Sequence, residues 1–167
     1  MEFPVGPNER ERLVALRETG LLAPGRDPEL DAVCAATKSH FGVPICLVTV
    51  LDESRQLLKA RQGLSLDEMP RGQAFCNHAI LADDVFVVPD APADPRFRDN
   101  PLVTGPPHLR FYAGAPLTYM AGIRLGALCI IDTVPRAFSR GDRAELAAFA
   151  DQTLALIARR AFVIPRV

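Results

Sequence analysis

The stretch FYAGAPLTYMAGIRLGALCIID, residues 111–132, contains two strand patterns separated by a short connection. Residues 111–118 and 125–132 are rich in apolar, β-branched and aromatic side chains, and Gly122 lies in the connection. Neighbouring strands joined by so few residues pair antiparallel. We therefore predict an antiparallel strand pair here.

A second strand pair is predicted nearer the N-terminus. Residues 45–51, ICLVTVL, are apolar or β-branched at nearly every position, which is typical of a strand covered on both faces. A polar turn then leads to a strand over residues 56–62. Its mixed face of Leu57, Lys59 and Arg61 indicates a position nearer the edge of the sheet.

Three longer helices flank these strands. The first is predicted over residues 9–19, and the second begins with Asp27 as N-cap before a proline and ends at Gly42. The third begins at Ser139, which forms a capping box with Asp142. Antiparallel strands with helices packed on them predict an α+β fold of about three layers.

The middle of the chain is less regular. Residues 75–81 read as a short helix and residues 85–88 as a short strand. Six prolines fall in residues 89–107, which predicts mostly loop. Asp94 can start one helical turn, and Asn100 with the proline after it is expected to stop that turn. A loop of this length inside a compact domain indicates either a functional segment or secondary structure that the sequence pattern does not reveal.

Composition excludes several classes of protein. The chain has 167 residues, the size of one domain, and a formal charge of −1, without the basic face that nucleic-acid modules carry. No apolar run approaches the ~20 residues that span a bilayer, and the N-terminus lacks the pattern of a signal peptide. We therefore expect a cytoplasmic protein that binds neither nucleic acid nor membrane.

The cysteines do not suggest a metal site or a disulfide framework. Cys34, Cys46, Cys76 and Cys129 show no paired spacing such as C-x-x-C. We expect four reduced thiols, no structural zinc and no cofactor.

Six short segments together resemble bacterial GAF domains of the type attached to sensor histidine kinases and diguanylate cyclases. These segments are 70–80 (PRGQAFCNHAI), 88–91 (VPDA), 94–97 (DPRF), 100–103 (NPLV), 110–117 (RFYAGAPL) and 125–132 (LGALCIID). The resemblance implies a GAF domain over residues 8–160, with an N-terminal extension over 1–7 and a C-terminal tail over 161–167.

The resemblance also implies an arrangement in space. It predicts an antiparallel sheet of five or six strands, with the first and last helices together on one face. The irregular segment from residue 64 to residue 110, here called the cover segment, would lie on the other face and enclose a ligand pocket. In the family, the terminal helices often pair with those of a second chain and continue into an output domain, although Pro165 would break such a continuation here.

Seven residues of this region are candidate ligand-binding residues. They are Phe75, Cys76, His78, Asp90, Phe97, Arg110 and Tyr112. Several have an ordinary structural alternative. Cys76 can be a small buried hydrophobe, His78 can anchor its helix to the backbone, Asp90 can form a turn, and Arg110 can pair with an aspartate.

The sequence therefore predicts a non-enzymatic sensory domain of signal transduction, as in two-component systems. It would bind a small molecule, form a homodimer through its terminal helices, and signal to a kinase, a cyclase or another output partner. One alternative is a thiol-dependent reductase of free methionine sulfoxide that uses Cys76, although residues 77–128 contain no second cysteine. The other alternative is a dimerisation scaffold without a pocket.

Overall fold

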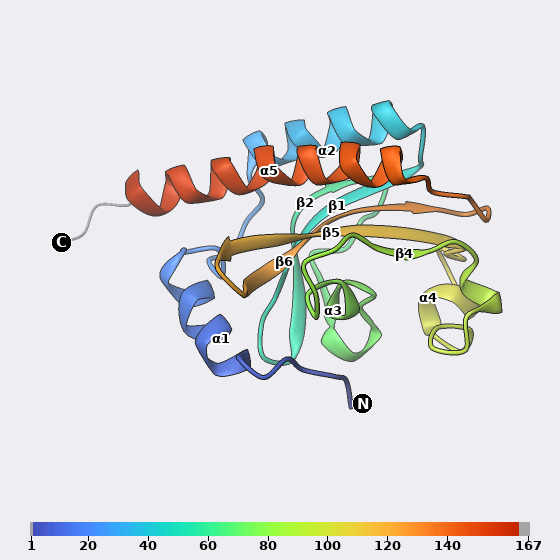
Figure 1. The fold of residues 1–167 in the computed structure, drawn as a ribbon, viewed down its shortest axis with the longest axis horizontal. Helices are drawn as coiled ribbons and strands as arrows, with labels where there is room; N and C mark the ends of the chain where they lie inside the picture. Colours follow the sequence, from blue (N-terminus) through green and yellow to red (C-terminus); the bar gives the residue numbers. More distant parts are fainter. Residues whose placement is uncertain (1, 164–167) are drawn as a thin grey trace.

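A computed structural model describes residues 2–163 of the chain, with side chains to residue 160. One six-stranded antiparallel sheet lies between two layers of helix and loop (Figure 1). This is the predicted α+β fold. Its elements are α1 (Glu9–Glu18), α2 (Pro28–Phe41), β1 (Ile45–Leu51), β2 (Arg55–Gln62), β3 (Glu68–Pro70), η1 (Arg71–Gln73), α3 (Cys76–Ala79), β4 (Phe86–Val88), η2 (Ala91–Ala93), α4 (Pro101–Thr104), β5 (Phe111–Met120), β6 (Ile123–Asp132) and α5 (Arg140–Val163).

The strand order is β3-β2-β1-β6-β5-β4, so the two predicted strand pairs lie side by side in the middle of the sheet. β5 and β6 pair from Phe111 opposite Asp132 to Met120 opposite Ile123, two residues further toward the turn than predicted for each strand. Every residue of β1 is buried, as its continuous apolar pattern predicted. The sheet therefore has a buried centre that contacts both outer layers.

The strands β1 and β6 approach each other closely at Gly126. A Cβ atom built there would lie 1.8 Å from the carbonyl oxygen of Thr49 on β1. Only glycine leaves room for that backbone. The pairing of β1 with β6 thus depends on this one residue.

The helices α2 and α5 lie side by side on one face of the sheet (Figure 1). The predicted caps are present: Asp27 Oδ1 accepts from the Glu29 amide at 2.9 Å, and Ser139 and Asp142 bond each other's backbone amides. The first and last helices were expected together on one face, and Ala15 and Leu16 of α1 do share one apolar core with Leu146 of α5. The direct neighbour of α5 is nevertheless α2, while α1 lies beside the β5–β6 turn, where Asn8 Nδ2 donates to the Gly122 carbonyl.

The cover segment lies on the opposite face and has its own apolar core against the sheet. Two details of this segment differ from prediction. Asn100 does more than stop a turn, because its side chain caps α4 by accepting from the Leu102 amide at 2.9 Å. The three-residue strand β3 was not predicted, and it places β2 one strand inside the edge.

The N-terminal extension packs against the cover segment. The guanidinium of Arg71 lies 4.6 Å from the centre of the Phe3 ring, and Asn77 Nδ2 donates to the Pro4 carbonyl at 2.8 Å. The predicted break at Pro165 lies outside the described residues. Among residues 2–163, no helix has the length and apolar character needed to cross a bilayer.

Candidate functional site

The cover segment meets the sheet in a cluster of aromatic rings. Phe75 stacks on Phe97 with ring centres 4.1 Å apart, and Tyr112 of β5 lies 5.3 Å from Phe75. All three side chains are buried. Short, tightly turned elements hold Phe75 and Phe97, while the central strand β5 holds Tyr112.

This cluster is almost solidly packed. Beneath it lies a cavity of about 20 Å³ whose walls include Leu47, Gln56, Phe75, Cys76 and Tyr112. That volume is enough for about one water molecule. The cover segment therefore lies where the family resemblance implied, but in this conformation it leaves no room for an organic ligand.

Two thiols and a phenol meet at the floor of the cluster. The hydroxyl of Tyr112 donates to Cys76 Sγ at 3.0 Å. Burial raises the pKa of the Cys76 thiol, but hydrogen bonds from Cys129, Thr49 and Tyr112 outweigh it, so the net pKa is lowered. Burial and the neighbouring thiols raise the pKa of Tyr112 well above its ordinary value.

One wall residue of the cavity was missed by sequence reasoning. Gln56 of β2 is only 2% exposed, and its Oε1 atom has no hydrogen-bond partner among the described residues. A buried amide oxygen without a partner costs roughly 1–3 kcal/mol. The sequence does carry one signal for this position. Side chains alternate between the two faces of a strand, so Gln56 points to the face opposite to Leu57, which is the face that the cover segment buries.

His78 lies at the rim of the cluster rather than in the cavity. Its ring is 4.8 Å from that of Phe97 and 5.8 Å from that of Phe86. Burial lowers its pKa, the nearby charge of Arg96 lowers it further, and Asp94 opposes both. Its buried Nδ1 atom has no hydrogen-bond partner in the described part of the chain.

Asp90 and Arg110 lie outside the cavity. Asp90 is exposed, and its backbone carbonyl accepts from the Ala93 amide at 3.1 Å. Arg110 Nη1 donates to the carbonyls of Val103 at 2.9 Å and Leu109 at 3.1 Å, which fastens the α4 loop to the sheet. The structure thus brings together Phe75, Cys76, Phe97 and Tyr112, with His78 at their rim.

A buried ionic cluster joins the N-terminus to the cover segment. Arg71 is 1% exposed and donates to Glu9 at 2.6 Å, to Asn77 Oδ1 at 2.7 Å and to the Asp52 carbonyl at 3.1 Å. Burial raises the pKa of Glu9, but Arg12 and Arg71 outweigh it and hold it at about 2. Sequence reasoning missed this cluster because its members lie up to 68 residues apart in the chain, from Glu9 to Asn77.

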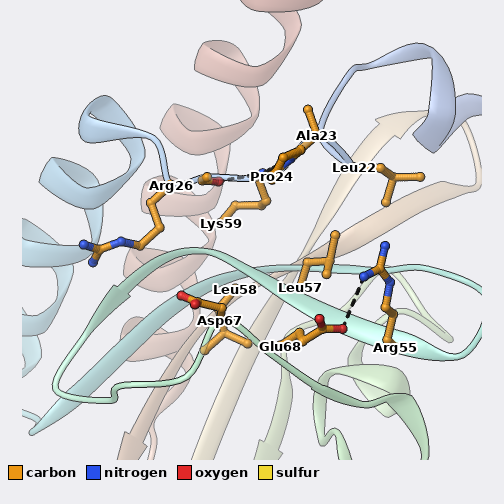
Figure 2. Close-up of a pocket in the computed structure, with 11 residues that line it drawn as sticks. Leu22, Ala23, Pro24, Arg26, Arg55, Leu57, Leu58, Lys59, Asp67 and Glu68 are labelled. Carbon is orange, nitrogen blue, oxygen red and sulfur yellow. Dashed lines mark hydrogen bonds and ion pairs between the residues drawn. The ribbon is translucent and has the colours of Figure 1, made fainter.

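A larger groove lies elsewhere, between the α1–α2 connector (residues 21–27) and the strands β2 and β3 (Figure 2). Its volume is about 510 Å³, within the usual range for small-molecule sites. Lys59, Arg26 and Arg55 supply cations to its walls. Within residues 2–163, no group of three or more His, Cys, Asp or Glu side chains is placed to hold a metal ion.

The known proteins that this chain resembles have the fold described above. The family model described as "GAF domain" matches residues 26–157. A cyclic di-GMP phosphodiesterase of Pseudomonas aeruginosa, PA2567, is 44% identical over 155 residues. That match covers 92% of this chain and 26% of the relative, so this chain spans about a quarter of the relative's length.

Two solved structures illustrate the structural likeness. The GAF domain of an Acinetobacter phosphoenolpyruvate-protein phosphotransferase has a TM-score of 0.69 at 19% identity, with 98% of this chain and 99% of that chain covered. The free methionine-R-sulfoxide reductase of Neisseria meningitidis has a TM-score of 0.65 at 21% identity, with 97% and 96% covered. At these identities the likeness concerns the fold alone.

Proposed function

Since this chain belongs to the GAF domain family, we propose that it is a regulatory module controlling an output domain of cyclic di-GMP turnover. Among the outputs expected from sequence, the 44% identity with a cyclic di-GMP phosphodiesterase favours this one over a histidine kinase. The signal would pass through the layer formed by α2 and α5. The chain itself would catalyse nothing.

The observation that carries this proposal is the fastening of α5 along α2. His40 pairs with Glu145 at 2.6 Å near the start of α5, and Arg159 pairs with Glu29 at 2.6 Å near its end. Arg160 pairs with the α2 cap Asp27. The 24 residues of α5 span about 36 Å. A small shift of α5 where it contacts α2 would therefore be carried to the far end of the helix. The sheet separates this layer from the cover segment.

The proposal is tested by replacing the matching 155 residues of the phosphodiesterase relative with this chain. Hydrolysis of cyclic di-GMP is then measured for the parent, the hybrid and a form lacking the segment. We expect the deletion to change the hydrolysis rate and the hybrid to restore it. Equal rates in all three proteins would contradict a regulatory role.

A small-molecule ligand beneath the cover segment is a second candidate function. The unpartnered Oε1 of Gln56 favours it, because a ligand with an N–H or O–H donor would satisfy that atom. The apolar part of the ligand would contact Phe75, Cys76, Phe97 and Tyr112. The other three candidate residues would contact the ligand only if the cover segment moved; these are His78, Asp90 and Arg110. The ligand must displace cover residues, since the cavity holds about 20 Å³.

Native mass spectrometry of freshly purified protein tests this second function. A retained small molecule that is lost from the Gln56→Leu variant would support it. Apoprotein alone, with no mass added by a metabolite extract, would leave the pocket-free scaffold as the better account. The packed cluster already favours that alternative in this conformation.

The reductase alternative rests on the approach of two thiols. Cys76 and Cys129 both line the small cavity, so Cys129 is a second thiol near Cys76 although residues 77–128 contain none. Both thiols are buried, however, so a substrate could not reach them without opening of the cover segment. We expect no turnover of free methionine sulfoxide with a thiol regenerator. Turnover that disappears in Cys76→Ser would establish the reductase instead.

A further inference from the structure

The groove between the α1–α2 connector and the outer strands has the properties of a second ligand site. It lies beside the sheet edge formed by β2 and β3, away from the cavity beneath the cover segment (Figure 2). Its volume of about 510 Å³ compares with about 20 Å³ for that cavity. A ligand can enter it without any displacement of the packed cluster.

Lys59 is the central feature of this groove. The residue is 8% exposed, and its Nζ donates to the carbonyls of Ala23 at 2.6 Å and Gly25 at 2.8 Å. An ammonium group has three N–H donors, so one has no acceptor among the described residues. No carboxylate lies within ion-pair distance of this Nζ in residues 2–163. A bound anion would stabilise this buried, unpaired ammonium group by accepting its third N–H.

The other charged residues of the groove also favour an anionic ligand. The wall carboxylates are already paired, Asp67 with Arg61 at 2.9 Å and Glu68 with Arg55 at 3.3 Å. Arg26 makes no ion pair with any described residue. Lys59 is therefore the buried cation available to a ligand, and the exposed Arg26 side chain, which points away from Lys59 in Figure 2, can reach that ligand by turning toward the groove. Burial lowers the pKa of Lys59, the charge of Asp27 opposes this lowering, and the charge of Arg160 adds to it. An anion bound in the groove would raise the pKa of Lys59 again.

The remaining wall is apolar. Leu22 of the connector and Leu57 and Leu58 of β2 line it, and Figure 2 shows Leu22 and Leu57 on its two opposite walls, toward the end that holds Arg55. A ligand that fills the groove must combine an anionic head with an apolar body. We propose that this groove binds a small organic anion, a carboxylate or phosphate ester with a short aliphatic part, with its head on Lys59 and the Arg26 side chain turned toward it.

The groove adjoins the fastening of α5. The Asp27 amide donates to the Lys59 carbonyl at 3.1 Å, and the Asp27 carboxylate pairs with Arg160 of α5. A ligand that moves the connector therefore acts on the residue that holds α2 and α5 together. The site would be an input distinct from the region beneath the cover segment.

Amide NMR of the full chain, titrated with hexanoate and with hexyl phosphate, tests the site. We expect at least one of them to shift the connector and the Leu57–Lys59 signals saturably, and the stronger binder identifies the head group. Hexylammonium should produce no such shifts. Equal binding of hexylammonium, or no saturable shift with either anion, would overturn the proposal.

Variants locate the head group. Lys59→Met and Arg26→Gln should each weaken binding at least tenfold, while Arg98→Gln, an exposed arginine of the cover segment, should not. If the Lys59→Met protein does not fold, Arg26→Gln still tests the site. Its folding should be unaffected, because Arg26 forms no ion pair with any described residue. Unchanged affinity in folded Arg26→Gln together with folded Lys59→Met would contradict the assignment.

Discussion

At the scale of single residues, Gly114 determines where Tyr112 lies. The two residues share one face of β5, and a Cβ atom at Gly114 would lie 2.2 Å from the Tyr112 hydroxyl oxygen. The ring of Tyr112 folds back over this glycine and so reaches Cys76 at 3.0 Å. The arrangement of thiol and phenol beneath the cover segment thus depends on a residue that contributes no side chain.

Gly114→Ala should therefore displace the Tyr112 ring and destabilise the protein by about 1–3 kcal/mol, the usual cost of overpacking. Denaturant unfolding followed by fluorescence or circular dichroism measures this change. The control is Gly141→Ala in the first turn of α5, where the new methyl group would lie 3.6 Å from Ser139 Oγ, an ordinary van der Waals contact. It should leave the stability unchanged or raise it by up to about 1 kcal/mol. Equal stability of the two variants would contradict this role of Gly114.

At the scale of elements, local signals predicted most of the fold. The caps at Asp27 and Ser139 and the apolar run 45–51 depend on neighbouring residues alone, and the structure has each where it was expected. β3 could not be predicted in this way, because three residues form a strand only through pairing with β2. The partner of α5 was also beyond local signals, since it depends on packing over the sheet.

The candidate site was predicted less completely than the fold. Motif resemblance grouped Phe75, Cys76 and Tyr112, and the structure places these three side chains in contact, while their role in ligand binding stays a prediction. Gln56 and Arg71 were missed because their burial is set by segments distant in sequence. A polar residue on a strand or turn reads as exposed until the tertiary structure covers it.

The link between α1 and the cover segment gives a prediction at this scale. Glu9→Gln leaves the buried Arg71 cation without its carboxylate. The lowered pKa of Glu9 corresponds to about 3 kcal/mol, which solvent screening of this part-exposed carboxylate reduces to about 2 kcal/mol at neutral pH. Folding lowers the pKa of Glu9 from 4.5 to about 2, so its contribution is full above pH 4.5 and is lost as the pH falls toward 2. Unfolding free energies of both proteins across this range measure the difference.

The control for this experiment is Glu11→Gln, at an exposed position of the same helix. It should change stability by less than about 0.5 kcal/mol at any of these pH values. A Glu9→Gln effect that stays constant down to pH 2 would show that the carboxylate charge is not what Arg71 requires.

At the scale of the whole molecule, the sequence predicts a homodimer through the terminal helices, and because α5 lies beside α2 in the structure, we expect the pairing surface to be formed by α2 and α5. Ile157 of α5 is buried in the core, whereas Leu154 and Leu156 of the same helix remain partly exposed and are available to a second chain. Light scattering should give twice the chain mass of 18.2 kDa. Leu156→Glu should yield monomer, and Val134→Glu, an exposed position outside the helices, should not. A monomeric wild-type chain at high concentration would contradict this expectation.

The central claim is that the α2–α5 layer controls an output domain. Its most direct test is cyclic di-GMP hydrolysis by the hybrid phosphodiesterase carrying Asp27→Asn, which keeps the α2 cap but removes the charge that holds Arg160. The account predicts a change of about fivefold or more, the lower end of typical coupling between sites, and no change for the exposed Asp99→Asn. An unchanged rate in a folded Asp27→Asn hybrid would contradict it.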